Sequence, residues 1–211
     1  EGWEALDLLL EQAERKEEAF QVWDRLATQY EEMGDGIAAL EKVQKMASLR
    51  PHAVAPALRL AQLSASAHDP AAAQRFHHAF RLADEAGDWK SAIEACRQWS
   101  ELAPGEPLPH REMARALTAL GRRPEAADAL RLAANLHEER KEFQEAAGAL
   151  ADLLDIAPER HEERERFARL LRETGETERS IAQTLLLADA YHAEGDTARA
   201  IERCREILEL D

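Results

Sequence analysis

Helix breaks recur along this 211-residue chain at two alternating spacings. The breaks are Gly34-Asp35, His68-Asp69-Pro70, Gly87-Asp88, Gly121-Arg122, Arg140-Lys141, Gly175-Glu176 and Gly195-Asp196. Successive breaks are separated alternately by roughly 34 residues and by roughly 20 residues. A fixed internal period indicates a repeat array, in which each unit buries its apolar face against its neighbours. One repeat therefore contains three helices and spans about 54 residues.

The segments between the breaks have helical periodicity. In one helix of each repeat, a small, a medium and a large apolar residue follow one face: Ala39, Val43 and Met46; Ala92, Cys96 and Trp99; Ala146, Leu150 and Leu153; Ala200, Cys204 and Ile207. Val and Ile together number only nine, which is too few for a β protein of this length. We therefore predict an all-α fold with short connections between antiparallel helices.

The expected helices are about twelve. They cover residues 3–14, 17–33, 36–49, 52–67, 70–86, 89–102, 107–120, 123–139, 142–157, 160–174, 177–194 and 197–209.

Several positions of this pattern resemble the tetratricopeptide repeat (TPR), a helix-turn-helix unit of about 34 residues that pairs a Gly-Asp-aromatic turn with a small residue and a closing proline. The signature positions are Gly34, Ala39, Pro51, Gly87, Trp89, Ala92, Pro104, Gly121, Ala126, Ala146, Pro158, Gly175, Gly195 and Ala200. The resemblance covers about residues 17 to 211 and implies a right-handed α-solenoid.

The period of three helices departs from the two-helix unit of that family. If the helices zigzag between two layers, equivalent helices of successive repeats point in opposite directions. The spatial period then becomes six helices, or two repeats, and helix roles alternate between repeats. For this reason the family's ligand positions are not transferred to this chain.

We expect residues 1–211 to form a single TPR-like domain with repeats at approximately 17–69, 70–122, 123–176 and 177–211. The printed chain ends where the motif would next have a proline, so it is interpreted as a segment of a longer protein.

The net charge of −15 is unevenly distributed. Residues 1–35 carry 11 acids and 3 bases, residues 36–136 carry 11 acids and 13 bases, and residues 137–211 carry 20 acids and 11 bases. Acidic ends disfavour nucleic acid and anionic membranes as partners. No uncharged run is long enough to insert into a membrane, and the arginine-rich composition suggests a GC-rich bacterial genome. We expect a cytoplasmic location.

Several residues that often serve in metal sites or as ligand platforms are interpreted as packing residues. Cys96 and Cys204 occupy the medium-sized apolar position, and Trp99 occupies the large one. Trp23 and the turn residue Trp89 are also assigned to the core. His77 is predicted to be partly buried, and the histidine spacings lack the i, i+4 pair of a zinc helix. No metal or other cofactor is expected.

Two groups of charged residues are considered as binding sites. The run 161–179 is interpreted as a solvated face with pairs along one helix, because Phe167 and Leu171 keep an apolar stripe. Arg111 and Arg115 share one helix face, and Arg122 and Arg123 follow. These four arginines are the candidate residues for binding an acidic segment of a partner.

The motifs of phosphate loops, nucleophile elbows and paired Cys-x-x-Cys sites do not occur in the sequence, so we predict that the chain is not an enzyme. One Asn and five Lys also disfavour the family's carboxylate clamp. The leading hypothesis is a protein-protein interaction scaffold that binds a peptide or a folded partner. The alternatives are a sensor or regulatory domain of a larger enzyme or transcription regulator, and a structural spacer that self-associates through uncapped ends.

Overall fold

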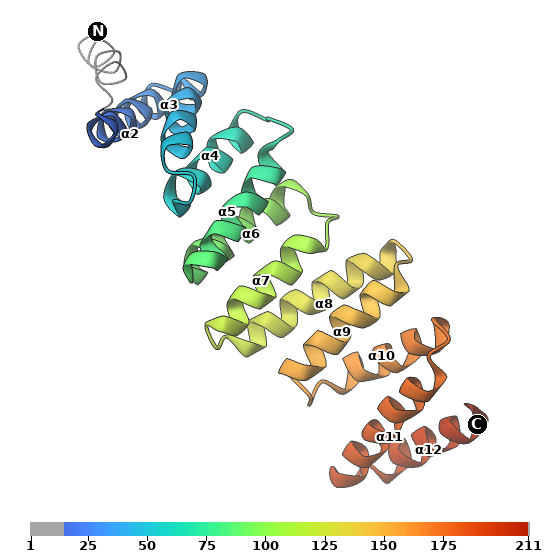
Figure 1. Ribbon diagram of the computed structural model, residues 1–211. Coiled ribbons are helices and arrows are strands. Elements are labelled where there is room, and N and C mark those ends of the chain that lie inside the picture. Colours follow the sequence, from blue (N-terminus) through green and yellow to red (C-terminus); the bar gives the residue numbers. More distant parts are fainter. Residues whose placement is uncertain (1–14, 211) are drawn as a thin grey trace. The chain divides into compact units, whose positions relative to one another are not determined.

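The computed structural model describes residues 15–210, and the expected helix 3–14 lies outside the described residues. The described helices are α2 (Lys16–Glu32), α3 (Gly36–Leu49), α4 (Val54–Ser66), α5 (Ala72–Ala86), α6 (Trp89–Leu102), α7 (Leu108–Ala119), α8 (Arg123–Glu139), α9 (Phe143–Ile156), α10 (His161–Glu173), α11 (Thr177–Ala193) and α12 (Thr197–Leu210). Each begins and ends within two residues of its expected position. The all-α fold is confirmed (Figure 1).

Left-handed backbone at the helix ends produces the repeating breaks. Five turn glycines have φ between 69° and 82°, and the degenerate breaks place His68 and Lys141 at φ 53° and 62°. Such a residue stops a helix and turns the chain back. At some turns an aspartate then caps the next helix: the carboxylate of Asp88 accepts a hydrogen bond from the backbone N–H of Ser91 at 3.2 Å. Hydrogen bonds from Ser91 hold the pKa of Asp88 below its ordinary value.

The repeated apolar positions form the core, as predicted, in three of the four repeats. Val43, Cys96 and Leu150 are fully buried. Cys204 occupies the same position in α12 but is exposed, so its assignment to the core was wrong. The reason is that α12 packs against α11, while no later helix of the described chain covers its other face.

The tryptophan and histidine assignments are largely confirmed. Trp23 and Trp99 are buried, whereas Trp89 is half-buried. His77 is half-buried and its ring stacks on Trp99 with the ring centroids 5.0 Å apart.

The chain divides into two compact units, one ending at Pro104 and one beginning at Gly105. Within the first unit, α4 contacts α6 directly and is joined to α2 by ion pairs, so α2, α4 and α6 form one layer and α3 and α5 the other. Within the second unit, ion pairs join α8, α10 and α12 in the same way, leaving α7, α9 and α11 in the other layer. The expected repeat borders and the single-domain assignment stay predictions.

Equivalent helices of successive repeats lie in different layers, as the odd helix number predicted. In the first unit, α3 and α6 occupy the same repeat position, yet α6 belongs to the layer of α4 and α3 to the layer of α5. In the second unit, α9 and α12 differ in the same way.

Arginine links join helices of the same layer and recur after two repeats. Arg59 of α4 donates to Glu31 at 2.8 Å and to Thr28 at 2.9 Å, both on α2. Arg166 of α10 donates to Glu138 at 2.6 Å and to Asn135 at 2.7 Å, both on α8. Each member of the second set occupies the position two repeats after its counterpart in the first set. This recurrence after two repeats is what a period of six helices predicts for the contacts within each unit.

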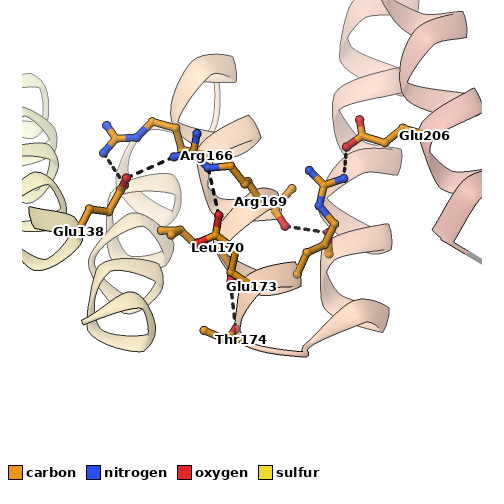
Figure 2. A network of polar contacts seen from close by, with 10 residues as sticks. Glu138, Arg166, Arg169, Leu170, Glu173, Thr174 and Glu206 are labelled. Atoms are coloured by element: carbon orange, nitrogen blue, oxygen red, sulfur yellow. Dashed lines mark hydrogen bonds and ion pairs between the residues drawn. The ribbon is translucent and has the colours of Figure 1, made fainter. Parts of the chain in front are cut away.

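The second link belongs to a wider network in the second unit (Figure 2). Glu138 also accepts from Arg169 at 3.2 Å, and Arg172 of α10 pairs with Glu206 of α12. These contacts correct the interpretation of the run 161–179 as mainly a solvated face. The long arginine side chains of α10 reach the adjacent helices, so several of the charges are half-buried and join helices.

We predict that Lys141→Gly raises the free energy of unfolding by about 0.5–1 kcal/mol, because lysine disfavours the left-handed backbone that glycine accepts. Urea denaturation followed by circular dichroism measures the change. The reciprocal variant Gly175→Lys is expected to lose about 1 kcal/mol. A destabilising effect of Lys141→Gly would contradict the proposed role of this turn.

We predict that Arg59→Ala and Arg166→Ala each lower the free energy of unfolding by about 1–2 kcal/mol, because each removes a half-buried guanidinium that donates to two residues of the adjacent helix. Arg97→Ala is the matched control, since Arg97 pairs only along α6 with Glu94 and Glu101, and it should cost less than about 0.5 kcal/mol. Equal losses in all variants would show that the links have no special role.

Candidate functional site

A groove of about 660 Å³ opens in the second unit between α7 and α9. Ala114 of α7 and Leu130 of α8 are its most buried residues, at 2% and 4% exposure, and form its floor. Leu108, which is 40% exposed, and the half-buried Ile156 add apolar surface to its walls. The polar lining consists of Arg111, Glu112, Arg115, Thr118 and Asp152. This combination of an apolar floor and charged walls is suited to a protein segment.

Two of the four predicted binding arginines line this α7–α9 groove. Arg111 of α7 donates to Asp152 of α9 at 3.0 Å, and both side chains are about half exposed. Arg115 lies 3.4 Å from Glu112 on the same helix. The four lining charges balance. The Arg111–Asp152 pair is exposed enough to exchange partners at little cost, whereas the Glu112 side chain is only 19% exposed.

The other two arginines lie at the turn into α8. Arg122 donates to Glu125 at 2.7 Å, and this hydrogen bond raises the pKa of Arg122. Arg123 is exposed at the first position of α8. Neither residue lines the α7–α9 groove, so the structure separates the four arginines into two pairs.

Next to Arg111, His110 does not add positive charge at neutral pH. It is about half buried, and burial lowers the pKa of its imidazole. The guanidinium groups are therefore the cationic groups of this part of α7.

A second groove, of about 490 Å³, lies in the first unit between α3 and α5. Its basic residues are Arg50, His52, Arg75, His78 and Arg81. This group forms no local sequence pattern, because its members come from a helix end, a turn and a different helix. Only the near-neutral charge of residues 36–136 pointed to this part of the chain.

Comparisons with known proteins identify the type of fold. No family model matches the chain, and no curated protein matches it. The chain is similar to a solved Signal Transduction ATPase with Numerous Domains (STAND) protein from Pyrococcus horikoshii that has a tetratricopeptide repeat sensor, with a TM-score of 0.51 and 17% identity. The fold is TPR-like.

This chain covers only part of that archaeal protein. The match includes 97% of the TPR-like chain but 38% of the STAND protein. A further match is the C-terminal part of a TPR repeat-containing protein from Cytophaga hutchinsonii, with 16% identity, a TM-score of 0.40, and 98% and 95% of the two chains covered. MamA from Desulfovibrio magneticus also matches at 12% identity and a TM-score of 0.30, over 90% and 94% of the two chains.

The described part of the TPR-like chain holds neither a metal site nor a membrane span. Among residues 15–210, no group of three or more His, Cys, Asp or Glu side chains is arranged to hold a metal ion. Within the same part of the chain, no helix is long and apolar enough to cross a membrane. The two grooves offer ion pairs, hydrogen bonds and apolar contact, which are the means of recognising a polypeptide.

Proposed function

We propose that this TPR-like chain is a non-catalytic scaffold that binds a segment of another protein in the α7–α9 groove. The observation that carries this proposal is the groove itself, which combines apolar residues with two arginine–carboxylate pairs in a helical repeat array. Repeat arrays supply such extended surfaces because the shared positions of each repeat build the core and the remaining positions are free to vary.

In this proposal Arg111 and Arg115 select the partner by its carboxylates. A carboxylate of the partner would replace Asp152 or Glu112 as the acceptor of a guanidinium donor, while an apolar side chain of the partner covers Leu108 and Ile156. Arginine suits this exchange because its planar donors form paired hydrogen bonds with a carboxylate. A partner segment with acidic and apolar residues would fit the groove.

A sensor function is a second candidate, supported by the likeness to the archaeal STAND protein, whose repeat is described as a sensor. In that case the segment bound in the groove would be the signal, and a larger protein would carry the output.

A structural function is the third candidate and rests on the exposed face of α12. Ile201 is 48% and Leu208 78% exposed, and Cys204 lies between them on the same face. The equivalent face of α9 is buried at Leu150, Leu153 and Leu154. Association of two chains through α12 would cover this surface.

We predict that Arg111→Glu with Arg115→Glu abolishes recovery of one specific protein in affinity isolation from the source cell. Reversing both charges puts carboxylates where the partner's carboxylates would bind, and like charges repel. Arg122→Glu with Arg123→Glu changes the net charge equally and should leave the recovery intact. Loss of the partner with this second pair alone would instead locate the site at the turn into α8, and unchanged recovery in both variants would refute the arginine hypothesis.

We predict that Leu208→Glu removes any concentration-dependent association of the chain in sedimentation velocity experiments. The exposed Leu208 would lie in the contact, and a carboxylate there opposes apolar burial. Ile37→Glu is the matched control, because Ile37 is 82% exposed on α3. A chain that stays monomeric at all concentrations would rule out the structural candidate.

A further inference from the structure

We propose that the groove between α3 and α5 in the first unit, called here the basic groove, binds the carboxylates of an acidic peptide segment. The basic groove is the α3–α5 groove defined above by Arg50, His52, Arg75, His78 and Arg81. It is a separate site from the α7–α9 groove, so its failure would leave the proposed scaffold function untouched.

Two of its arginines are held in place from outside the groove. The guanidinium of Arg50 is 2.5 Å from Glu17 of α2 and lies over the ring of Phe20, 3.9 Å from its centroid. The guanidinium of Arg75 donates to Asp69 at 2.6 Å. Neither Glu17 nor Asp69 lines the groove. A guanidinium has five N–H donors, so these fixed groups retain donors for a ligand at a reduced entropic cost of binding.

The remaining basic side chains are exposed at the groove. Arg81 has a side-chain exposure of 65% and makes only a long contact of 3.8 Å with Glu85, one helical turn along α5. His52 and His78 are exposed as well. Glu85 is the one carboxylate among the lining residues of this groove. In the α7–α9 groove, by contrast, two carboxylates balance two arginines.

The repeat pattern shows that the fold does not need these basic residues. Helices α9 and α11 of the second unit are equivalent to α3 and α5, because the buried Val43 matches Leu150 and the buried Ala72 and Phe76 match Ser180 and Thr184. In that register the counterparts of the five basic residues are Ala157, Glu159, Gln183, Leu186 and Asp189. The same helix packing therefore accepts neutral or acidic residues, and the basic set distinguishes the first unit.

The surroundings favour a peptide over a nucleic acid. The floor of the groove contains Ala57, Leu60 and Leu82, which suit apolar side chains placed between carboxylates. Residues 15–35 carry 6 acids against 3 bases and would repel a long polyanion, while a short acidic segment confined to the groove meets mainly basic groups among the lining residues. The affinity of such a contact is expected to fall as salt rises, because the charges are partly exposed.

The test uses the whole chain and a fluorescein-labelled peptide of alternating glutamate and leucine, with binding measured by fluorescence anisotropy. Arg81→Asp introduces the residue that the second unit carries at Asp189, so the fold should accept it. We expect this variant to weaken peptide binding by about tenfold, since it replaces a charged donor with a repelling carboxylate. His78→Leu copies Leu186 and should weaken binding by a smaller factor.

Lys90→Asp is the matched control, because it makes the same change of charge in the first turn of α6, outside the groove. We expect it to change binding by less than about twofold. Equal weakening by Arg81→Asp and Lys90→Asp, or no binding of the peptide, would overturn the proposal. Binding of a glutamine-and-leucine peptide with the same affinity would overturn it too, as would equal binding of a single-stranded DNA oligonucleotide.

Discussion

The odd number of helices in each repeat is the constraint on which the rest of this structure depends. Helices that turn back at left-handed residues such as Gly34 and Lys141 alternate between two layers. Three helices to a repeat then force every repeat position to change layer from one copy to the next. Arg59 joins helices of one layer within the first unit, and Arg166 joins α10 to α8 within the second unit. Glu112, at the same position of the intervening repeat, lies on α7 in the other layer of the second unit and lines a groove. Similarly, Thr28 and Asn135 accept from those arginines, and their counterpart Arg81 lines the basic groove.

The fold could be predicted from the sequence because its determinants are local and repeated. The turn residues fix the helix ends, and buried residues such as Val43, Cys96 and Leu150 mark the same face in each copy. Cys204 was assigned to the core incorrectly, because the burial of this position depends on the following helix as much as on its own helix. The repeat pattern of the sequence does not report on that second contribution. The charged run of α10 was misjudged because its partners Glu138 and Glu206 lie on other helices, 28 and 34 residues away from Arg166 and Arg172.

The candidate sites were harder to predict, since a groove combines side chains from separate helices. Arg111 and Arg115 were found because they share one helix face, but Asp152, the partner of Arg111, and the apolar Ile156 come from α9. In the basic groove, Arg50 and Arg81 are separated by a complete helix and two turns. Such a group leaves no local pattern, and its significance appears only when the equivalent residues Ala157 and Asp189 are compared in register.

The two-repeat spacing of the arginine links has a consequence for how an array of this kind can change length. Insertion or deletion of one repeat would shift the alternation of layers by three helices. Residues that line a groove would then take the positions of residues that link helices, and linking residues would take the positions of groove residues. Insertion of two whole repeats would preserve all the surfaces. An engineered array based on this chain should therefore be lengthened in pairs of repeats, with Arg59 and Arg166 marking equivalent positions for the joins.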